Sequence, residues 1–249
     1  MAQEVRLWEI NDEDHLNELK REKLNLEDRL ENWLEKDISM ISDELLVIGR
    51  QVRSFFGGII DILCLDNNGD VVIVELKRDK TPRDITAQVL DYATWVKELT
   101  RNQIIELANN YYGDHALLEE KFENQFKEEF PEVINESHKM IIVASEIDSS
   151  SERIIRYLSD SYGMDINAIT FHYFQSENGN EYISRVYLID PSEVKYKTGS
   201  KGPSKRATPP SFDEFYKIAE ENGVGDLYCQ NRLKMTAKSA EKWRKKAAC

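Results

Sequence analysis

The sequence predicts an α/β fold in which helices flank a mixed β-sheet with a hairpin at its centre. Two apolar runs, GGIIDILCL (57–65) and VVIVELK (71–77), have the length and composition of strands and lie on either side of the turn-forming stretch Asp66–Asp70. After this hairpin, strand-like apolar runs alternate with amphipathic segments, as in other α/β proteins. The chain has 249 residues, 41% hydrophobic and 32% charged, which is enough for one large folded domain.

Before the hairpin we expect one helix and one strand. From Asp12 to Lys36, leucines and Trp33 recur at steps of three and four residues among charged side chains, which predicts an amphipathic helix with one break near Leu24. The apolar run Leu45–Val52 then predicts a short strand that enters the sheet.

A strong helix start follows the hairpin. Thr81 is placed as the N-cap, Pro82 at the first helical position, and Asp84 where its carboxylate can return a capping bond. We expect this helix to run to about Leu99.

The rest of the chain alternates helices and strands and then changes in composition. Helices are predicted at 102–111, 115–130 and 150–162, and strands at 139–145, 168–174 and 181–189. Residues 195–210 are basic, rich in Gly, Pro and Ser, and have no apolar period, which predicts a flexible linker. We therefore expect a main domain over 1–194, this basic linker over 195–210, and a small helical appendage over 211–249.

Charge is distributed unevenly. Residues 1–190 hold 20 basic and 39 acidic side chains, whereas residues 191–249 hold 13 basic and 7 acidic ones. The net charge of −13 argues against a polyanionic partner, but the basic tail could meet one or could simply be a solvated segment. No apolar stretch approaches the ~20 residues that span a bilayer, and Met1–Asn11 has no signal-peptide core, so we expect a cytoplasmic protein without membrane contact.

Several classes of site have no support in the sequence. Cys64, Cys229 and Cys249 are isolated, which argues against a disulfide framework or a structural zinc site. The four histidines lack HxH or HExxH spacing, and no GxxxxGK[ST] or GxGxxG segment occurs.

The hairpin carries the most informative charges. If its strands pair about Asn68, then Asp61 and Glu75 lie opposite each other, and Lys77 projects from the same face as Glu75. Two opposed carboxylates with Cβ atoms roughly 5 Å apart repel each other unless a cation or a shared proton lies between them. The pattern therefore predicts a divalent metal held by Asp61 and Glu75. Hard oxygen ligands favour Mg²⁺ or Mn²⁺, which can lower the pKa of a bound water.

These residues, together with a helical Glu27 before them and Gln88 and Tyr92 after them, resemble the PD-(D/E)xK nuclease superfamily. The resemblance is to the RecB-like branch with the QxxxY motif, and within it to the NucS-type endonuclease domain, over about Leu26–Phe174. It implies a restriction-endonuclease-like fold and a Mg²⁺-dependent endodeoxyribonuclease that acts in DNA repair or in defence against foreign DNA. Branched, mismatched and single-stranded DNA are all open as substrates.

The resemblance also implies roles for individual residues. Glu27 would complete the acidic cluster, with Glu31 one turn later as the alternative. The Leu76 carbonyl would join Asp61 and Glu75 as a metal ligand, and Lys77 would orient the attacking water. Gln88 and Tyr92, four residues apart on one helix, would hold the metal-bound water or a DNA phosphate. Further phosphate contacts are expected from Arg50, Arg53 and Arg78.

Two departures from the family pattern are visible. Ile60 stands where the superfamily has the proline of its name, and fewer than 30 residues precede Glu27, whereas NucS-type enzymes have a DNA-binding and dimerising domain there. Substrate preference and homodimerisation therefore stay open. Two other classes of protein are also open: a nuclease-fold module that binds DNA or a partner without cutting, and a scaffold with an acidic recruiting surface.

Overall fold

The computed structural model describes residues 5–12, 14–22, 26–81, 84–113 and 117–191, which lie within a first unit that spans Met1–Thr198. The side chains of residues 26–28 and 78–80 are outside this description. The predicted linker (195–210) and helical appendage (211–249) lie outside the described residues as well. The division of the chain at residue 194 therefore stays a prediction.

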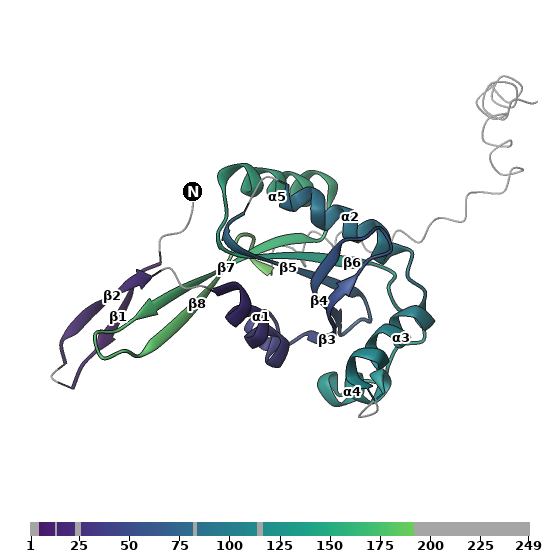
Figure 1. The fold of residues 1–249 in the computed structure, drawn as a ribbon, viewed down its shortest axis with the longest axis horizontal. Helices are drawn as coiled ribbons and strands as arrows, with labels where there is room; N and C mark the ends of the chain where they lie inside the picture. The colour runs from purple at the N-terminus through teal and green to yellow at the C-terminus, as the bar shows by residue number, and fades with distance from the viewer. Residues whose placement is uncertain (1–4, 13, 23–25, 82–83, 114–116, 192–249) are drawn as a thin grey trace, which may run out of the picture. The chain divides into compact units, whose positions relative to one another are not determined.

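The described residues form a mixed eight-stranded sheet covered by helices on both faces (Figure 1). The strand order is β1-β2-β7-β6-β5-β4-β3, with β8 paired to β7. β5, β6 and β7 run parallel to one another, and every other pairing is antiparallel. The predicted fold class, a mixed sheet with the β4–β5 hairpin inside it, is confirmed. The strands are β1 (Leu7–Ile10), β2 (Leu16–Glu22), β3 (Leu45–Arg53), β4 (Ile59–Asp66), β5 (Val71–Lys80), β6 (His138–Glu146), β7 (Ile166–Gln175) and β8 (Glu181–Tyr187).

Two hydrophobic clusters form the core, one on each face of the sheet. On one face, Leu30 and Leu34 of α1 pack with Ile62, Cys64 and other residues of β4 and β5. On the other face, α2 packs over β5 and β6, and α5 packs over β7. The helices are α1 (Leu26–Lys36), α2 (Ile85–Lys97), α3 (Arg101–Tyr112), α4 (Leu118–Phe126) and α5 (Ser149–Tyr162), with a 3₁₀ turn at Ile38–Met40. Among the described residues, no helix is both long and apolar enough to cross a membrane.

The turn of the β4–β5 hairpin sets the register of its strands. Asp66 Oδ1 accepts hydrogen bonds from the backbone N–H groups of Asn68 (2.8 Å) and Asp70 (2.9 Å). Gly69 has a φ of 81°, a left-handed conformation that favours glycine. The resulting pairs, from Leu65–Val71 to Ile62–Val74, have the register that the sequence predicts.

The expectation of one helix from Asp12 to Lys36 is wrong in its first half. Residues 7–22 form the β1–β2 hairpin, and the helix begins only at Leu26. Leu16 and Leu19 have helical spacing, but Leu16 is 66% exposed and only Leu19 is buried in β2. Pairing of residues 16–19 with β1, and of residues 20–22 with the end of β7, outweighs the local helical pattern.

The expected start of α2 is also wrong. The helix begins at Ile85, and its N-cap residue Asp84 makes no side-chain capping bond. The Thr81 hydroxyl instead donates to Asp148 Oδ2 (3.0 Å) and accepts from the Asp148 N–H (3.1 Å). Asp148 caps α5, so Thr81 ties the end of β5 to the start of α5 rather than beginning its own helix.

Candidate active site

Asp61, Glu75 and Lys77 lie together where the β4–β5 ladder ends. The backbone pairs stop at Ile62–Val74, and the next position in this register would join Asp61 to Glu75. There the Asp61 side chain replaces a backbone acceptor: its Oδ2 accepts the Leu76 N–H at 2.7 Å. The two acids are therefore neighbours on adjoining strands, as the alternation of side chains requires.

Glu75 is a buried carboxylate with one oxygen satisfied and one not. Its Oε1 accepts from Lys77 Nζ (2.8 Å) and from Gln88 Nε2 (2.7 Å), while Oε2 has no hydrogen-bond partner among the described residues. Burial, and then the charge of Asp61, raise the pKa of Glu75 to about 7, although the Lys77 ammonium opposes the shift. An unpartnered carboxylate oxygen at such depth is costly unless something outside the chain binds it.

Gln88 and Tyr92 connect α2 to both strands of the hairpin. Gln88 Nε2 lies 2.8 Å from the Tyr92 hydroxyl oxygen as well as 2.7 Å from Glu75. The Tyr92 hydroxyl donates to the Ile59 carbonyl (2.8 Å), two residues before Asp61. Because the ring is almost fully buried, this chain of contacts fixes Glu75 relative to the beginning of β4.

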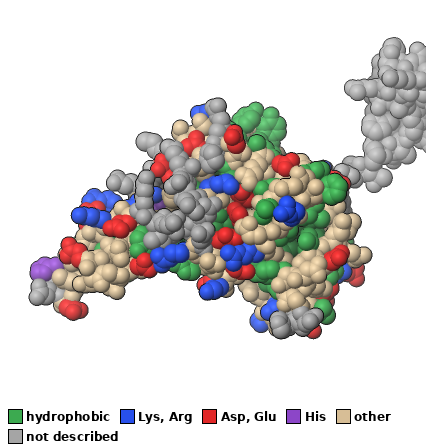
Figure 2. Space-filling model, viewed as in Figure 1, with side chains coloured by type: hydrophobic (Ala, Val, Ile, Leu, Met, Phe, Trp, Pro, Cys, Tyr) green, Lys and Arg blue, Asp and Glu red, His purple; other side chains and the backbone are tan. Residues whose placement is uncertain are grey.

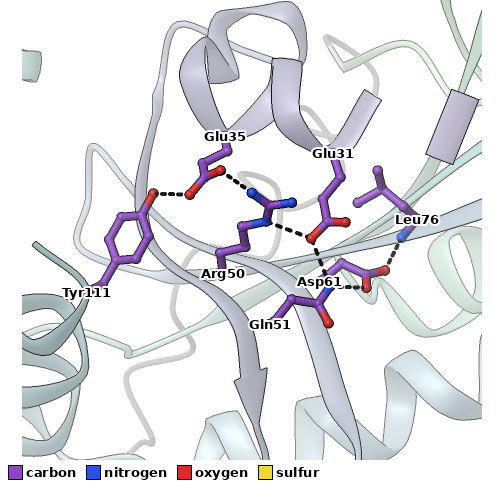
Figure 3. A network of polar contacts seen from close by, with 7 residues as sticks. All are labelled: Glu31, Glu35, Arg50, Gln51, Asp61, Leu76 and Tyr111. Atoms are coloured by element: carbon purple, nitrogen blue, oxygen red, sulfur yellow. Dashed lines mark hydrogen bonds and ion pairs between the residues drawn. The ribbon is translucent and has the colours of Figure 1, made fainter. Parts of the chain in front are cut away.

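On the other side of the site, α1 is held to β3 by a charged network (Figure 3). Arg50 Nε donates to Glu31 Oε1 (2.9 Å), and its Nη1 donates to Glu35. The Tyr111 hydroxyl donates to the second oxygen of Glu35 at 3.1 Å. The Glu31 carboxylate, hydrogen-bonded to the guanidinium, raises the pKa of Arg50 above its usual value.

Gln51 joins this network to the site, and sequence reasoning missed it. Its Nε2 donates to Glu31 Oε1 (2.8 Å) and to Asp61 Oδ1 (3.0 Å) (Figure 3). The residue has a φ of 50°, a left-handed conformation that is rare for a side chain of this kind.

A β-bulge explains the position of Gln51. The β3–β4 register shifts by one residue between Val47 and Gly49, so that Arg50 pairs with Ile62 and Gln51 falls opposite Asp61. With no bulge, the earlier register would place Arg50 there instead. Bulges often re-aim a side chain beside a functional site, and the isolated Gly49 within the strand is the local signal that could have indicated this one.

The remaining predicted residues have different outcomes. Glu27 lies on α1 and Arg78 on β5, but both side chains are outside the described set. Arg53 is exposed at the end of β3. Arg50 is engaged by two carboxylates of α1, which leaves its expected role as a phosphate contact without support. Glu31, the alternative to Glu27, reaches Asp61 through Gln51.

The donor set at this position is compatible with a hard divalent cation. Asp61 and Glu75 supply carboxylate oxygens, and Glu75 Oε2 is buried and unpartnered. Within the described ranges, no three His, Cys, Asp or Glu side chains are grouped to hold a metal by themselves. The two acids would therefore need a further ligand, such as a backbone carbonyl or water, as Mg²⁺ commonly has.

Comparison with known proteins shows what part of the chain is similar to. Residues 26–108 match the family model of the endonuclease NucS C-terminal domain. No curated protein matches the chain. Among solved structures, a repair endonuclease from Pyrococcus abyssi is 17% identical, with 59% of this chain and 48% of that chain covered and a TM-score of 0.35. A complex of EndoMS with dsDNA2 is 19% identical (61% and 48% covered, TM-score 0.35), and EndoMS in its apo form is 18% identical (59% and 47% covered, TM-score 0.32). The match spans about half the length of each of these proteins. Residues 26–108 are therefore similar to the NucS C-terminal nuclease domain, which confirms the resemblance indicated by the sequence motifs.

Proposed function

We propose that this protein is a divalent-metal-dependent DNA endonuclease that hydrolyses phosphodiester bonds at the site formed by Asp61, Glu75 and Lys77. The observation that carries the proposal is the buried, unpartnered Glu75 Oε2 beside Asp61, with a lysine ammonium 2.8 Å from the other Glu75 oxygen. The match of residues 26–108 to the NucS endonuclease family supports it, and DNA as the substrate and repair as the setting are proposed on the same basis.

In this proposal the metal ligands are Asp61, Glu75 and the Leu76 carbonyl. When bound, Mg²⁺ or Mn²⁺ lowers the pKa of a water ligand and neutralises charge on the phosphoryl oxygens. The Leu76 N–H and Gln51 hold the two Asp61 oxygens, so that the carboxylate needs little reorganisation. Burial keeps Glu75 partly protonated near neutral pH, so cation binding must release that proton.

The other site residues act around these ligands. Lys77 is partly exposed, at 25%, so its ammonium can reach a phosphodiester while it touches Glu75. There it would orient the attacking water and stabilise the negative charge that develops in the transition state. Gln88 and Tyr92 hold Glu75 in place, and Arg53, exposed on the adjoining strand, is available to a DNA phosphate.

A cleavage assay with matched variants tests the proposal. Labelled single-stranded, branched, mismatched and duplex DNA are incubated with wild type, Asp61→Asn, Lys77→Met and Lys121→Met, in Mg²⁺, Mn²⁺ or EDTA. We expect Lys77→Met to lower the cleavage rate by about 10²–10³-fold. Lys121→Met, an exposed lysine on α4, should cleave as wild type does.

Two outcomes would contradict the proposal. One is cleavage that survives EDTA or the Asp61→Asn substitution, since the activity would then arise elsewhere. The other is DNA binding without cleavage under every condition, which would favour a non-catalytic nuclease-fold module.

A further inference from the structure

Two aromatic side chains are exposed beside the site and have no role in it. Figure 2 shows hydrophobic side chains at several places on one face of the molecule, among charged ones. Among the described residues, the aromatic side chains that are most exposed are Phe55, at 86%, and Phe56, at 63%, in the turn between β3 and β4. Exposing two adjacent large rings has a solvation cost, which suggests a binding role when the rings are held in place.

The turn holds these rings by its backbone. Ser54 N–H donates to the Gly58 carbonyl (2.8 Å), and Gly57 N–H donates to the Ser54 carbonyl (3.1 Å). The buried Ser54 hydroxyl also accepts the Gly58 N–H (3.1 Å). Gly57 has a φ of 93°, which only glycine adopts without strain. The two rings meet edge to face, with centroids 5.7 Å apart.

The same turn is in contact with the proposed catalytic residues. A Cβ at Gly58 would come within 2.4 Å of Tyr92 Cε1, so glycine there lets the turn lie directly on the Tyr92 ring. Tyr92 in turn connects Ile59 to Gln88 and so to Glu75. A strand rises about 3.4 Å per residue, so the tip lies roughly 10–14 Å from Asp61, the length of three or four base steps along one DNA strand.

We propose that Phe55 and Phe56 stack on nucleobases of the DNA strand whose phosphodiester occupies the Asp61–Glu75 site, so that the enzyme favours substrates with unpaired bases near the cut. The choice of DNA as the occupant rests on the proposed function. Exposed Arg53, two residues before Phe55, adds a cation for the phosphate of a stacked nucleotide. Bases within a regular duplex hide their faces in the stack, whereas unpaired bases present them to aromatic side chains.

Binding of a strand with and without bases tests this proposal. The probe is a fluorescein-labelled single-stranded oligonucleotide, compared with one that has abasic sites through its central stretch and keeps every phosphate. Anisotropy is measured on the full chain in EDTA, so that no strand is cut. We expect Phe55→Ala/Phe56→Ala to weaken binding of the ordinary strand by on the order of 5- to 150-fold per stacked base and to leave the abasic strand unaffected.

The chain offers a matched control. Tyr157 and Tyr162 on α5 form a second exposed edge-to-face pair, with ring centroids 5.3 Å apart. Tyr157→Ala/Tyr162→Ala should bind both probes as wild type does. Phe55→Trp/Phe56→Trp should keep the preference for bases, and Phe55→Leu/Phe56→Leu, apolar without a π-face, should lose most of it.

The outcomes separate this inference from the proposed function. Equal loss on both probes, no loss on the ordinary strand, or wild type that binds neither strand would each overturn base stacking. A change in sedimentation with unchanged DNA binding would also overturn it and would assign the rings to self-association. If wild type never cuts DNA but prefers the strand with bases, and this preference depends on Phe55 and Phe56, the nuclease proposal fails and base stacking stands. If wild type cuts DNA and the alanine variant keeps the preference for bases, the nuclease proposal stands and base stacking fails.

Discussion

The Gln51 side-chain amide donates to Asp61 Oδ1 at 3.0 Å from a backbone with a φ of 50°. A strained residue that orients a carboxylate beside a functional site suggests that the strain is retained for positioning. The same amide group donates to Glu31, so Gln51 also connects α1 to Asp61. Through this one side chain the bulge in β3 affects the chemistry proposed for β4.

Gln51→Gly should therefore separate activity from stability. Glycine adopts the left-handed φ freely, and relief of roughly 1 kcal/mol of strain should offset much of the lost hydrogen bonding. We expect a free energy of unfolding within about 1 kcal/mol of wild type and DNA cleavage reduced by about 10-fold or more. Urea denaturation and single-turnover cleavage measure the two effects. Unchanged cleavage would mean that Asp61 does not depend on Gln51.

Glu75→Gln should change how stability depends on pH. The pKa of Glu75 is raised from 4.5 to about 7 in the folded state, so the native protein holds this proton at pH values where the unfolded chain has lost it. The favourable contribution of protonated Glu75 to the stability of the fold is complete below pH 4.5 and is lost as pH rises through 7. Glutamine resembles the protonated acid. In EDTA we therefore expect the free energy of unfolding of the variant to exceed that of wild type by up to about 3 kcal/mol at pH 8 and to match it near pH 4.5.

Urea denaturation at several pH values, with and without Mg²⁺, checks this expectation. Mg²⁺ should stabilise wild type at pH 8 and should have little effect on Glu75→Gln, because the variant lacks the carboxylate. A stability difference that does not vary with pH would show that Glu75 is ionised throughout.

Arg50→Met should loosen the attachment of α1. The change leaves the partly buried carboxylates of Glu31 and Glu35 without their cation, and we expect a loss of about 1–3 kcal/mol in the free energy of unfolding. Arg29→Met is the control, because Arg29 makes an exposed pair with Glu181 at 2.8 Å that solvent screens. Equal effects of the two substitutions in urea denaturation would contradict an anchoring role for Arg50.

Tyr92→Phe should reduce cleavage while the ring stays packed. The substitution removes the hydroxyl that lies between Gln88 and the Ile59 carbonyl, and we expect a stability loss of about 1 kcal/mol. Tyr112→Phe is matched, since the Tyr112 hydroxyl also donates to a backbone carbonyl, that of Val47, away from the site. Only Tyr92→Phe should lower the cleavage rate; a similar loss of activity in both variants would indicate a general effect on the fold.

Much of the sheet could be predicted from the sequence because its signals are local. The apolar strands β3 to β7 are continuous and bounded by turn residues, and the Asp66–Asp70 turn sets the hairpin register within a few residues. The register then places Asp61 next to Glu75 without further information. The sequence correctly predicted a helix that carries Gln88 and Tyr92. It placed the start of this helix too early, because Thr81 was interpreted as the N-cap.

The N-terminal hairpin and the role of Thr81 could not be predicted in the same way. The last residues of β2 pair with residues of β7 more than 150 positions away, and the Thr81 hydroxyl hydrogen-bonds to Asp148, 67 positions away. Local propensity is a weak guide wherever a distant partner supplies the hydrogen bonds.

Local sequence information is enough to place these charges on one face of the hairpin, because alternation along strands and the turn between them depend only on neighbouring residues. What surrounds those charges depends on the packing of the whole fold. The bulge that brings Gln51 to Asp61, the depth that raises the pKa of Glu75, and the packing of Tyr92 beneath the Phe55–Phe56 turn all arise from contacts between separate elements of the fold. Such contacts depend on the packing of whole elements and not on the residues adjacent to them, which is why they become visible only in the folded protein.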